Sequence, residues 1–167
     1  TNTGNLLPNA DFQYAHPTTA SWPDKWTAQN GGVTRQTSPE TGDYMLRMGY
    51  TAAGTFLDSE KVRVSIGQRF SVSVRAKADA TPGGQMLVGY LFWDTAGNYV
   101  GGTGNYLNAG SLSTRWQTIG FSDTVPAGIG AYYMSVRIDV APTNGKYYYV
   151  DHAELTLVTV QQDQVSG

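Results

Sequence analysis

The segment Tyr147–Leu157 constrains the fold more than any other part of the sequence. From Tyr149 onward apolar and polar residues alternate, and aromatic and β-branched residues are frequent. Side chains of a β-strand point to opposite faces in turn, so this pattern predicts a strand with one face in a core. In that register Asp151 lies on the otherwise apolar face, together with Ala153 and Leu155. A carboxylate there is unfavourable unless it is paired, hydrogen-bonded or bound to a metal. Spacing alone does not choose between a cation and satisfaction by backbone N–H groups or solvent.

The same alternation returns twice more. In Phe70–Lys77 it places Arg75 outward, and in Tyr132–Val140 it places Tyr133 and Arg137 outward. No stretch of eleven residues or more has a helical period, and short apolar stretches recur about every ten residues between Gly, Pro and Asn. The sequence therefore predicts an all-β fold, a sandwich of two antiparallel sheets.

Composition excludes several classes of protein. The net charge is -2 and no basic run is present, so we expect no nucleic-acid partner. No apolar run approaches eighteen residues, so we expect no membrane insertion. The chain has no cysteine, which excludes disulfides, zinc–thiolate sites and cysteine catalysis.

One domain is predicted over residues 5–158, after a disordered segment at 1–4 and before a polar tail or linker at 159–167. Charged residues make up only 14% of the chain and glycines number 20, a composition typical of extracellular β domains. The chain begins at Thr1 rather than at Met, which is typical of a processed chain or of a piece of a longer protein, and we expect it to be covalently part of a longer extracellular protein.

The sequence does not predict an enzyme. It has only two histidines, His16 and His152, and no serine-hydrolase, metalloprotease or phosphate-binding motif. A glycosidase needs two carboxylates that face each other across a cleft, and nothing in the pattern selects such a pair.

A carbohydrate-binding site would need different residues. Sugar rings have apolar C–H faces and polar edges, so a site requires an exposed aromatic side chain beside a few fixed polar groups. If the strands that carry Arg75 and Arg137 are neighbours in one sheet, the two arginines share one ligand face. Arg137 and Asp139 can also simply pair with each other. The candidate ligand-binding residues are Arg75, Tyr90, Trp93, Tyr133, Arg137 and Asp139.

Short motifs in order along the chain resemble the carbohydrate-binding modules of families four, nine, sixteen and twenty-two. The resemblance covers residues 5 to 158, and its order and spacing are more specific for the fold than for a ligand. The motifs are NLLPNADFQ (5–13), PDKW (23–26), TGDYML (41–46), VSIGQRFSVS (64–73), FWDTAGN (92–98), WQTI (116–119) and YYVD (148–151). The resemblance implies a jelly-roll β-sandwich.

The resemblance also implies a structural Ca²⁺ that ties the first strand to the last. Asp151 matches the family's closing-strand aspartate, and Gln13 stands where a ligating glutamate is usual. Carbonyls of Asp11, Glu40 and Asp43 match the other positions. A neutral amide at Gln13 replaces a carboxylate, which should weaken the site, although the Asp11 side chain can compensate.

The function that the resemblance implies is non-catalytic recognition of a polysaccharide or glycan. The alternative is a structural, adhesion or receptor-binding domain of a phage tail or other surface assembly, since the same jelly roll serves there. A glycan-degrading domain is a third reading. The sequence does not select the sugar.

Overall fold

The computed structural model describes residues 4–107 and 112–158. These residues form two antiparallel sheets packed face to face, which confirms the predicted jelly-roll β-sandwich. No helix among them is long and apolar enough to cross a membrane. The predicted segments 1–4 and 159–167 lie, apart from Gly4, outside the described residues. The strands are β1 Trp26–Gln29, β2 Val33–Thr37, β3 Tyr44–Gly49, β4 Thr55–Ser59, β5 Val62–Arg63, β6 Arg69–Ala78, β7 Met86–Trp93, β8 Tyr99–Leu107, β9 Gln117–Thr124, β10 Tyr133–Val140 and β11 Tyr147–Val158.

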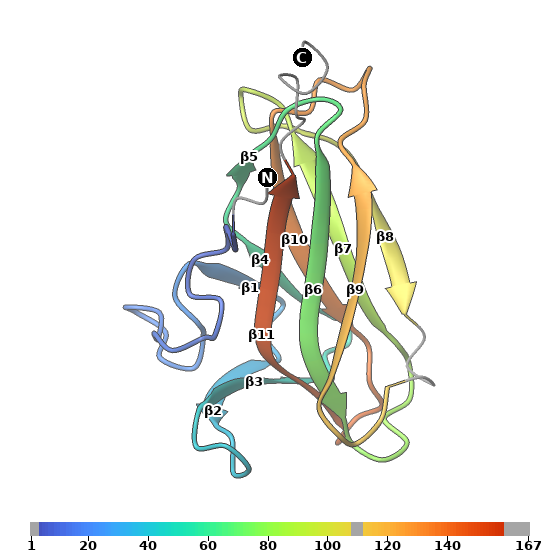
Figure 1. Cartoon of the computed structure of the whole chain (residues 1–167). Coiled ribbons are helices and arrows are strands. Elements are labelled where there is room, and N and C mark those ends of the chain that lie inside the picture. The colour runs from blue at the N-terminus through green and yellow to red at the C-terminus, as the bar shows by residue number, and fades with distance from the viewer. Residues whose placement is uncertain (1–3, 108–111, 159–167) are drawn as a thin grey trace.

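Each sheet is named here after its central strand. The β10 sheet has the order β1-β4-β10-β7-β8, with β5 paired to one end of β10. The β11 sheet has the order β2-β3-β11-β6-β9. Figure 1 shows β11, β6 and β9 in front of β10 and β7. Strands that follow each other in sequence therefore often lie in different layers, and β6 and β7 are one such pair.

The core lies between the sheets and is built from alternate positions of the long strands. On β6 every second residue from Phe70 to Ala78 is buried, and on β10 Met134, Val136 and Ile138 are fully buried. The Phe70 ring packs edge-on against Tyr90 and Phe92, at centroid distances of 4.9 and 6.2 Å. Burial of each such apolar side chain contributes about 1.5–3 kcal/mol to stability, so this interdigitation holds the two layers together.

A β-bulge in β11 corrects the sequence prediction for Asp151. Val150 pairs with Ala76, but His152 pairs with Arg75, so Asp151 is the extra residue. Val150 and Ala153 are buried, and Asp151 and His152 between them both lie on the outer side of the sheet. Because the extra residue shifts the alternation, Asp151 does not share the core face of Ala153, and the register predicted across it was wrong.

Candidate functional site

The outer face of the β10 sheet carries four of the six predicted ligand-binding residues. Trp93 and Tyr133 are direct neighbours on β7 and β10, and Arg137 and Asp139 follow along β10. The Trp93 indole Nε1 donates a hydrogen bond to Ser135 Oγ at 3.0 Å, which fixes the orientation of the ring. Trp93 is only half-buried, so part of this ring remains open to solvent.

Two neighbours contact the Trp93 ring. Lys61 Nζ lies 4.3 Å from the ring centroid, within the range of a cation–π interaction. Tyr99 packs edge-on at a centroid distance of 5.8 Å. The ring therefore stands between a flexible ammonium group and a second, exposed aromatic ring.

Arg137 is held by Asp58 on the neighbouring strand β4. Arg137 Nε donates to Asp58 Oδ1 at 2.7 Å and Nη2 donates to Oδ2 at 2.9 Å, a bidentate pair. Gln29 on β1 donates to the same carboxylate at 2.8 Å. The hydrogen bonds to Asp58 outweigh burial and raise the pKa of Arg137. Arg137 thus pairs chiefly with Asp58, rather than with Asp139 as its sequence neighbourhood alone allowed.

Sequence reasoning missed Asp58 and Gln29. Residues 55–57 form one of the short apolar stretches of the sequence, and Asp58 continues their alternation and lies outward with Phe56. Asp139 remains less well satisfied than Asp58. Burial raises the pKa of the Asp139 carboxyl, Arg137 lowers it, and the nearby Asp58 charge adds to the increase.

An open hollow of about 480 Å³ lies beside Trp93 on this face. Its edges come from four segments: β1, the end of β4 with the residues that follow it, and the neighbouring strands β7 and β10. It is lined by Thr27, Gln29, Asp58, Ser59, Glu60, Lys61, Trp93 and Ser135. An aromatic ring with hydroxyl, amide, carboxylate and ammonium groups around it has the composition that sugar recognition requires.

Two of the predicted ligand-binding residues do not belong to this face. Arg75 lies on the outer side of β6, in the β11 sheet, so the sandwich separates it from Arg137. The prediction that the two arginines share one ligand face is therefore wrong, because β6 and β10 are in different sheets.

Tyr90 is 5% exposed and points into the core, so it cannot serve as an exposed stacking surface. Its hydroxyl donates to Asp123 Oδ2 at 2.5 Å. Burial, strengthened by this contact, raises the pKa of Tyr90 well above its ordinary value. The Tyr90 hydroxyl is thus a satisfied polar group within the aromatic cluster of Phe70 and Phe92.

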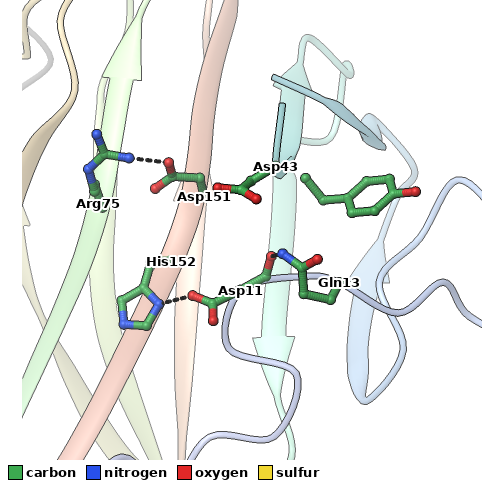
Figure 2. Close-up of a pocket in the computed structure, with 7 residues that line it drawn as sticks. Asp11, Gln13, Asp43, Arg75, Asp151 and His152 are labelled. Carbon is green, nitrogen blue, oxygen red and sulfur yellow. Dashed lines mark hydrogen bonds and ion pairs between the residues drawn. The ribbon is translucent and has the colours of Figure 1, made fainter. Parts of the chain in front are cut away.

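The β11 bulge forms the centre of a second hollow, of about 360 Å³, on the opposite side of the sandwich. Four of the five predicted calcium-binding residues line it: Asp11, Gln13, Asp43 and Asp151 (Figure 2). Glu40, whose backbone carbonyl the resemblance implied as a ligand, does not line it, and its carboxylate pairs with Lys77. The chain thus brings its N-terminal segment, the β2–β3 turn and the closing strand to one place, as the resemblance implied.

Asp151 is the least accessible carboxylate of this hollow, with a side chain 9% exposed. Its Oδ2 pairs with Arg75 Nη1, while Oδ1 is buried and has no hydrogen-bond partner among the described residues. Burial raises the pKa of Asp151, and Arg75 opposes that shift. A buried oxygen with no partner is unfavourable, so Asp151 Oδ1 marks an incomplete polar site.

Asp11 and Asp43 complete the acidic side of the hollow. The Asp11 carboxylate contacts His152 Nδ1 (Figure 2). His152 Nε2 lies 3.0 Å from Glu154 Oε1. Carboxylate and amide oxygens are ligands that Ca²⁺ accepts, so the donor types fit this ion. Among the described residues, however, no three His, Cys, Asp or Glu side chains are gathered as a metal-binding group. Asp11 and Asp151 are instead engaged by His152 and Arg75.

Comparisons with known proteins show what the chain is similar to. No family model matches it, and no curated protein matches it. The enzymatically active domain of tailspike protein 4 from bacteriophage CBA120 matches with a TM-score of 0.69 at 18% identity, over 92% of this chain and 21% of that one. This chain therefore corresponds to a part of that protein.

Two smaller structures match over nearly their whole length. The CBM22-1 xylan-binding domain from Paenibacillus barcinonensis gives a TM-score of 0.58 at 16% identity, over 90% of this chain and 93% of that one. A cyclase from Fischerella sp. gives 0.63 at 11% identity, over 97% and 100%. Carbohydrate-binding modules of families 4, 16 and 61 also match. At identities this low, the matches show a shared fold and nothing more. The protein has the jelly-roll fold of the carbohydrate-binding modules that its sequence resembles.

Proposed function

We propose that this chain is a non-catalytic module that binds a polysaccharide or glycan on behalf of a larger extracellular protein. The observation that carries the proposal is the hollow beside Trp93 on the outer face of the β10 sheet. Its aromatic ring is oriented by Ser135, and polar groups of three segments surround it. The fold supports the proposal, because whole carbohydrate-binding modules share it.

The geometry suits an uncharged sugar ring. The ring's C–H face stacks on the Trp93 indole in the place that Lys61 now occupies, and the ammonium moves aside to donate to ligand oxygens. At the other edge of the sugar ring, the Asp58 carboxylate accepts hydrogen bonds from sugar hydroxyl groups and the Gln29 amide donates to them. Asp58 is already held by Arg137 and Gln29, so little side-chain freedom has to be lost on binding.

The proposal predicts weak binding that depends on Trp93. Single hollows of this kind give dissociation constants of roughly micromolar to millimolar, or about -8 to -4 kcal/mol. A glycan array and affinity electrophoresis in a panel of soluble polysaccharides identify the ligand. Trp93→Ala should weaken retardation tenfold or more. Tyr50→Ala, which removes a half-exposed aromatic ring elsewhere, is the matched control and should leave it unchanged.

The same panel separates the alternatives. A second candidate function is a structural or adhesion domain of a surface assembly, and the match to a phage tailspike protein supports it. Absence of every glycan hit, together with oligomerisation in sedimentation experiments, would favour that function. Release of reducing sugar from the panel would instead replace the non-catalytic reading with an enzymatic one.

We further propose a structural Ca²⁺ in the hollow at the β11 bulge, held by Asp11, Gln13, Asp43 and Asp151. The unpartnered Asp151 Oδ1 and the oxygen-rich lining support this proposal. Bound calcium would offset the carboxylate charges and link the N-terminal segment to β11. That link would add to the backbone hydrogen bonds from Leu6 N to Leu155 O and from Ala153 N to Ala10 O. Glu40 is left out, because it does not line this hollow.

A further inference from the structure

We propose that the module has a second sugar-binding site, for a neutral sugar residue, in a hollow on the outer face of the β11 sheet. The inference rests on the proposed function for its ligand class but not for its residues, which lie across the sandwich from Trp93. The hollow measures about 300 Å³ and lies where β6 ends and β11 begins, next to the β2–β3 turn. Figure 1 shows the positions of these strands. Tyr149, Met45 and Asp79 are its central residues.

The floor of this hollow is apolar although it lies on an outer face. Met45 alternates in phase with the outward Arg47 on β3, yet it is only 3% exposed. Pro39, in the turn between β2 and β3, contributes an apolar wall. The turn is closed by hydrogen bonds from Ser38 N to Asp43 O at 2.6 Å and from Gly42 N to Ser38 O at 2.9 Å. The wall is therefore fixed before any ligand arrives.

Tyr149 supplies the aromatic ring, and Asp79 holds it in place. The Tyr149 hydroxyl donates to Asp79 Oδ1 at 3.1 Å, and Tyr147 N donates to Oδ2 of the same carboxylate at 2.9 Å. Burial and the Asp79 charge raise the pKa of Tyr149 to about 12, so the phenol stays protonated and keeps this bond. A carboxylate accepts about four hydrogen bonds, which leaves Asp79 with capacity for about two ligand hydroxyls.

Lys77 adds a donor to the same hollow. It pairs directly with Tyr149 across β6 and β11, and its Nζ lies 5.4 Å from the Tyr149 ring centroid. An ammonium beside a carboxylate matches two neighbouring sugar hydroxyls, one accepting from Lys77 and the other donating to Asp79. Gln36 adds an amide at the rim.

The local charge favours a neutral ligand. Lys77 contacts Glu40, the Tyr149 hydroxyl donates to Asp79, and Arg47 pairs with Tyr149 across β3 and β11. Two cations thus stand against two carboxylates around this ring, so no excess of positive charge is left to bind an acidic or sulfated sugar. The apolar floor, the fixed ring and the donor–acceptor pair are the elements that a neutral pyranose requires.

Two sites on opposite faces give the module a property that one site cannot provide. A single copy can hold two polysaccharide chains at once, because the whole sandwich lies between the Trp93 hollow and the Tyr149 hollow. The module would then cross-link polymers as well as tether its parent protein. Simultaneous engagement also raises the apparent affinity for a dense polysaccharide surface without any new contact.

The test maps both faces of the intact chain by amide chemical shifts in NMR. The probes are three neutral oligosaccharides: xylohexaose, β-1,4-galactotriose and cellohexaose. At least one should shift the amides of residues 77–80 and 147–149 in a saturable manner. Gln36→Ala should raise the dissociation constant measured at these amides threefold or more, and Tyr149→Ala tenfold or more. Gln29→Ala, the matched change on the β10 sheet, should leave it unchanged.

The outcomes distinguish this inference from the proposed function. Shifts confined to residues 27–29, 58–61 and 93 would overturn the second site and leave the first intact. Shifts confined to the Tyr149 hollow would do the reverse, and no shift with any probe would overturn both. Tyr149→Ala can disturb folding. If the Tyr149→Ala protein does not fold, the result for Gln36→Ala decides whether the second site exists. The wild type should also precipitate the polymer whose oligosaccharide binds, and Trp93→Ala should bind it without precipitation.

Discussion

The two outer faces of the sandwich hold a buried carboxylate in different ways. On the β10 sheet, both Asp58 oxygens accept hydrogen bonds, from Arg137 and Gln29. On the β11 sheet, Asp151 is similarly inaccessible, with a side chain 9% exposed against 13% for Asp58, but one of its oxygens has no partner among the described residues.

This difference is informative because burial alone does not cause it. A fully paired carboxylate such as Asp58 needs no further partner. Its side chain is already held in one orientation before a ligand binds. An incompletely paired one such as Asp151 lacks a hydrogen-bond donor or cation at its second oxygen, which loses its hydration without compensation. The first arrangement is typical of a preformed binding face. The second is the arrangement that the proposed Ca²⁺ would complete.

Calcium removal should produce the largest effect, and only on the β11 side. If the ion binds Asp151 and its neighbours, saturation at a hundredfold over the dissociation constant stabilises the fold by about 2.7 kcal/mol. Chelator should lower the melting temperature measured by differential scanning fluorimetry, and added Ca²⁺ should restore it. Asp151→Ala should abolish this response, whereas Asp58→Ala should retain it. An identical melt with and without chelator, and no ion found by mass spectrometry, would argue that Arg75 alone compensates Asp151.

Breaking the Arg137–Asp58 pair should have the next largest effect. Arg137→Met leaves a nearly inaccessible carboxylate with only Gln29 as a partner, so we expect a loss of about 1–3 kcal/mol in urea unfolding. Lys77→Met is the matched change on the other face. Its partner Glu40 is 52% exposed and can be hydrated, so the loss should be within about 1 kcal/mol. Equal losses for the two variants would show that burial of the partner does not set the cost.

Local alternation predicted which side of a strand each residue occupies, and it did so correctly for β6 and β10. Alternation could not predict which strands pair with each other, because strand pairing depends on contacts between segments that are distant in the sequence. Arg75 and Arg137 were both outward, as expected, but in different sheets. A nearly continuous apolar run such as β7 has no alternation, so it gave no means of separating the buried Tyr90 from the outward Trp93.

The site at the β11 bulge also shows what local alternation cannot predict. The resemblance selected Asp11, Gln13, Asp43 and Asp151, which the fold does bring together, because those positions follow motifs rather than periodicity. The bulge itself adds one residue and reverses the faces on either side of it. No pattern of apolar and polar residues distinguishes an extra residue at Asp151 from an ordinary step along the strand.

The smallest predicted effect compares two carboxylates on the same face, Asp58 and Asp139. Burial raises the pKa of Asp139 above that of the unfolded chain, although Arg137 partly opposes the shift. The folded state therefore holds a proton on Asp139 more tightly than the unfolded state does. The stability that this group contributes is present below its unfolded pKa of about 3.9 and is lost as pH rises through the folded pKa.

Asp139→Asn should consequently raise the melting temperature slightly at pH 7, because it removes an ionised carboxylate that lacks a partner as good as that of Asp58. The gain should shrink as the pH is lowered toward 4, where the wild-type carboxyl becomes protonated. Melting curves of both proteins from pH 3.5 to 8 measure the difference, and Asp58→Asn should show the opposite sign at pH 7. A constant difference across the whole range would mean that Asp139 is not the titrating group, and that its neighbourhood is better hydrated than its burial indicates.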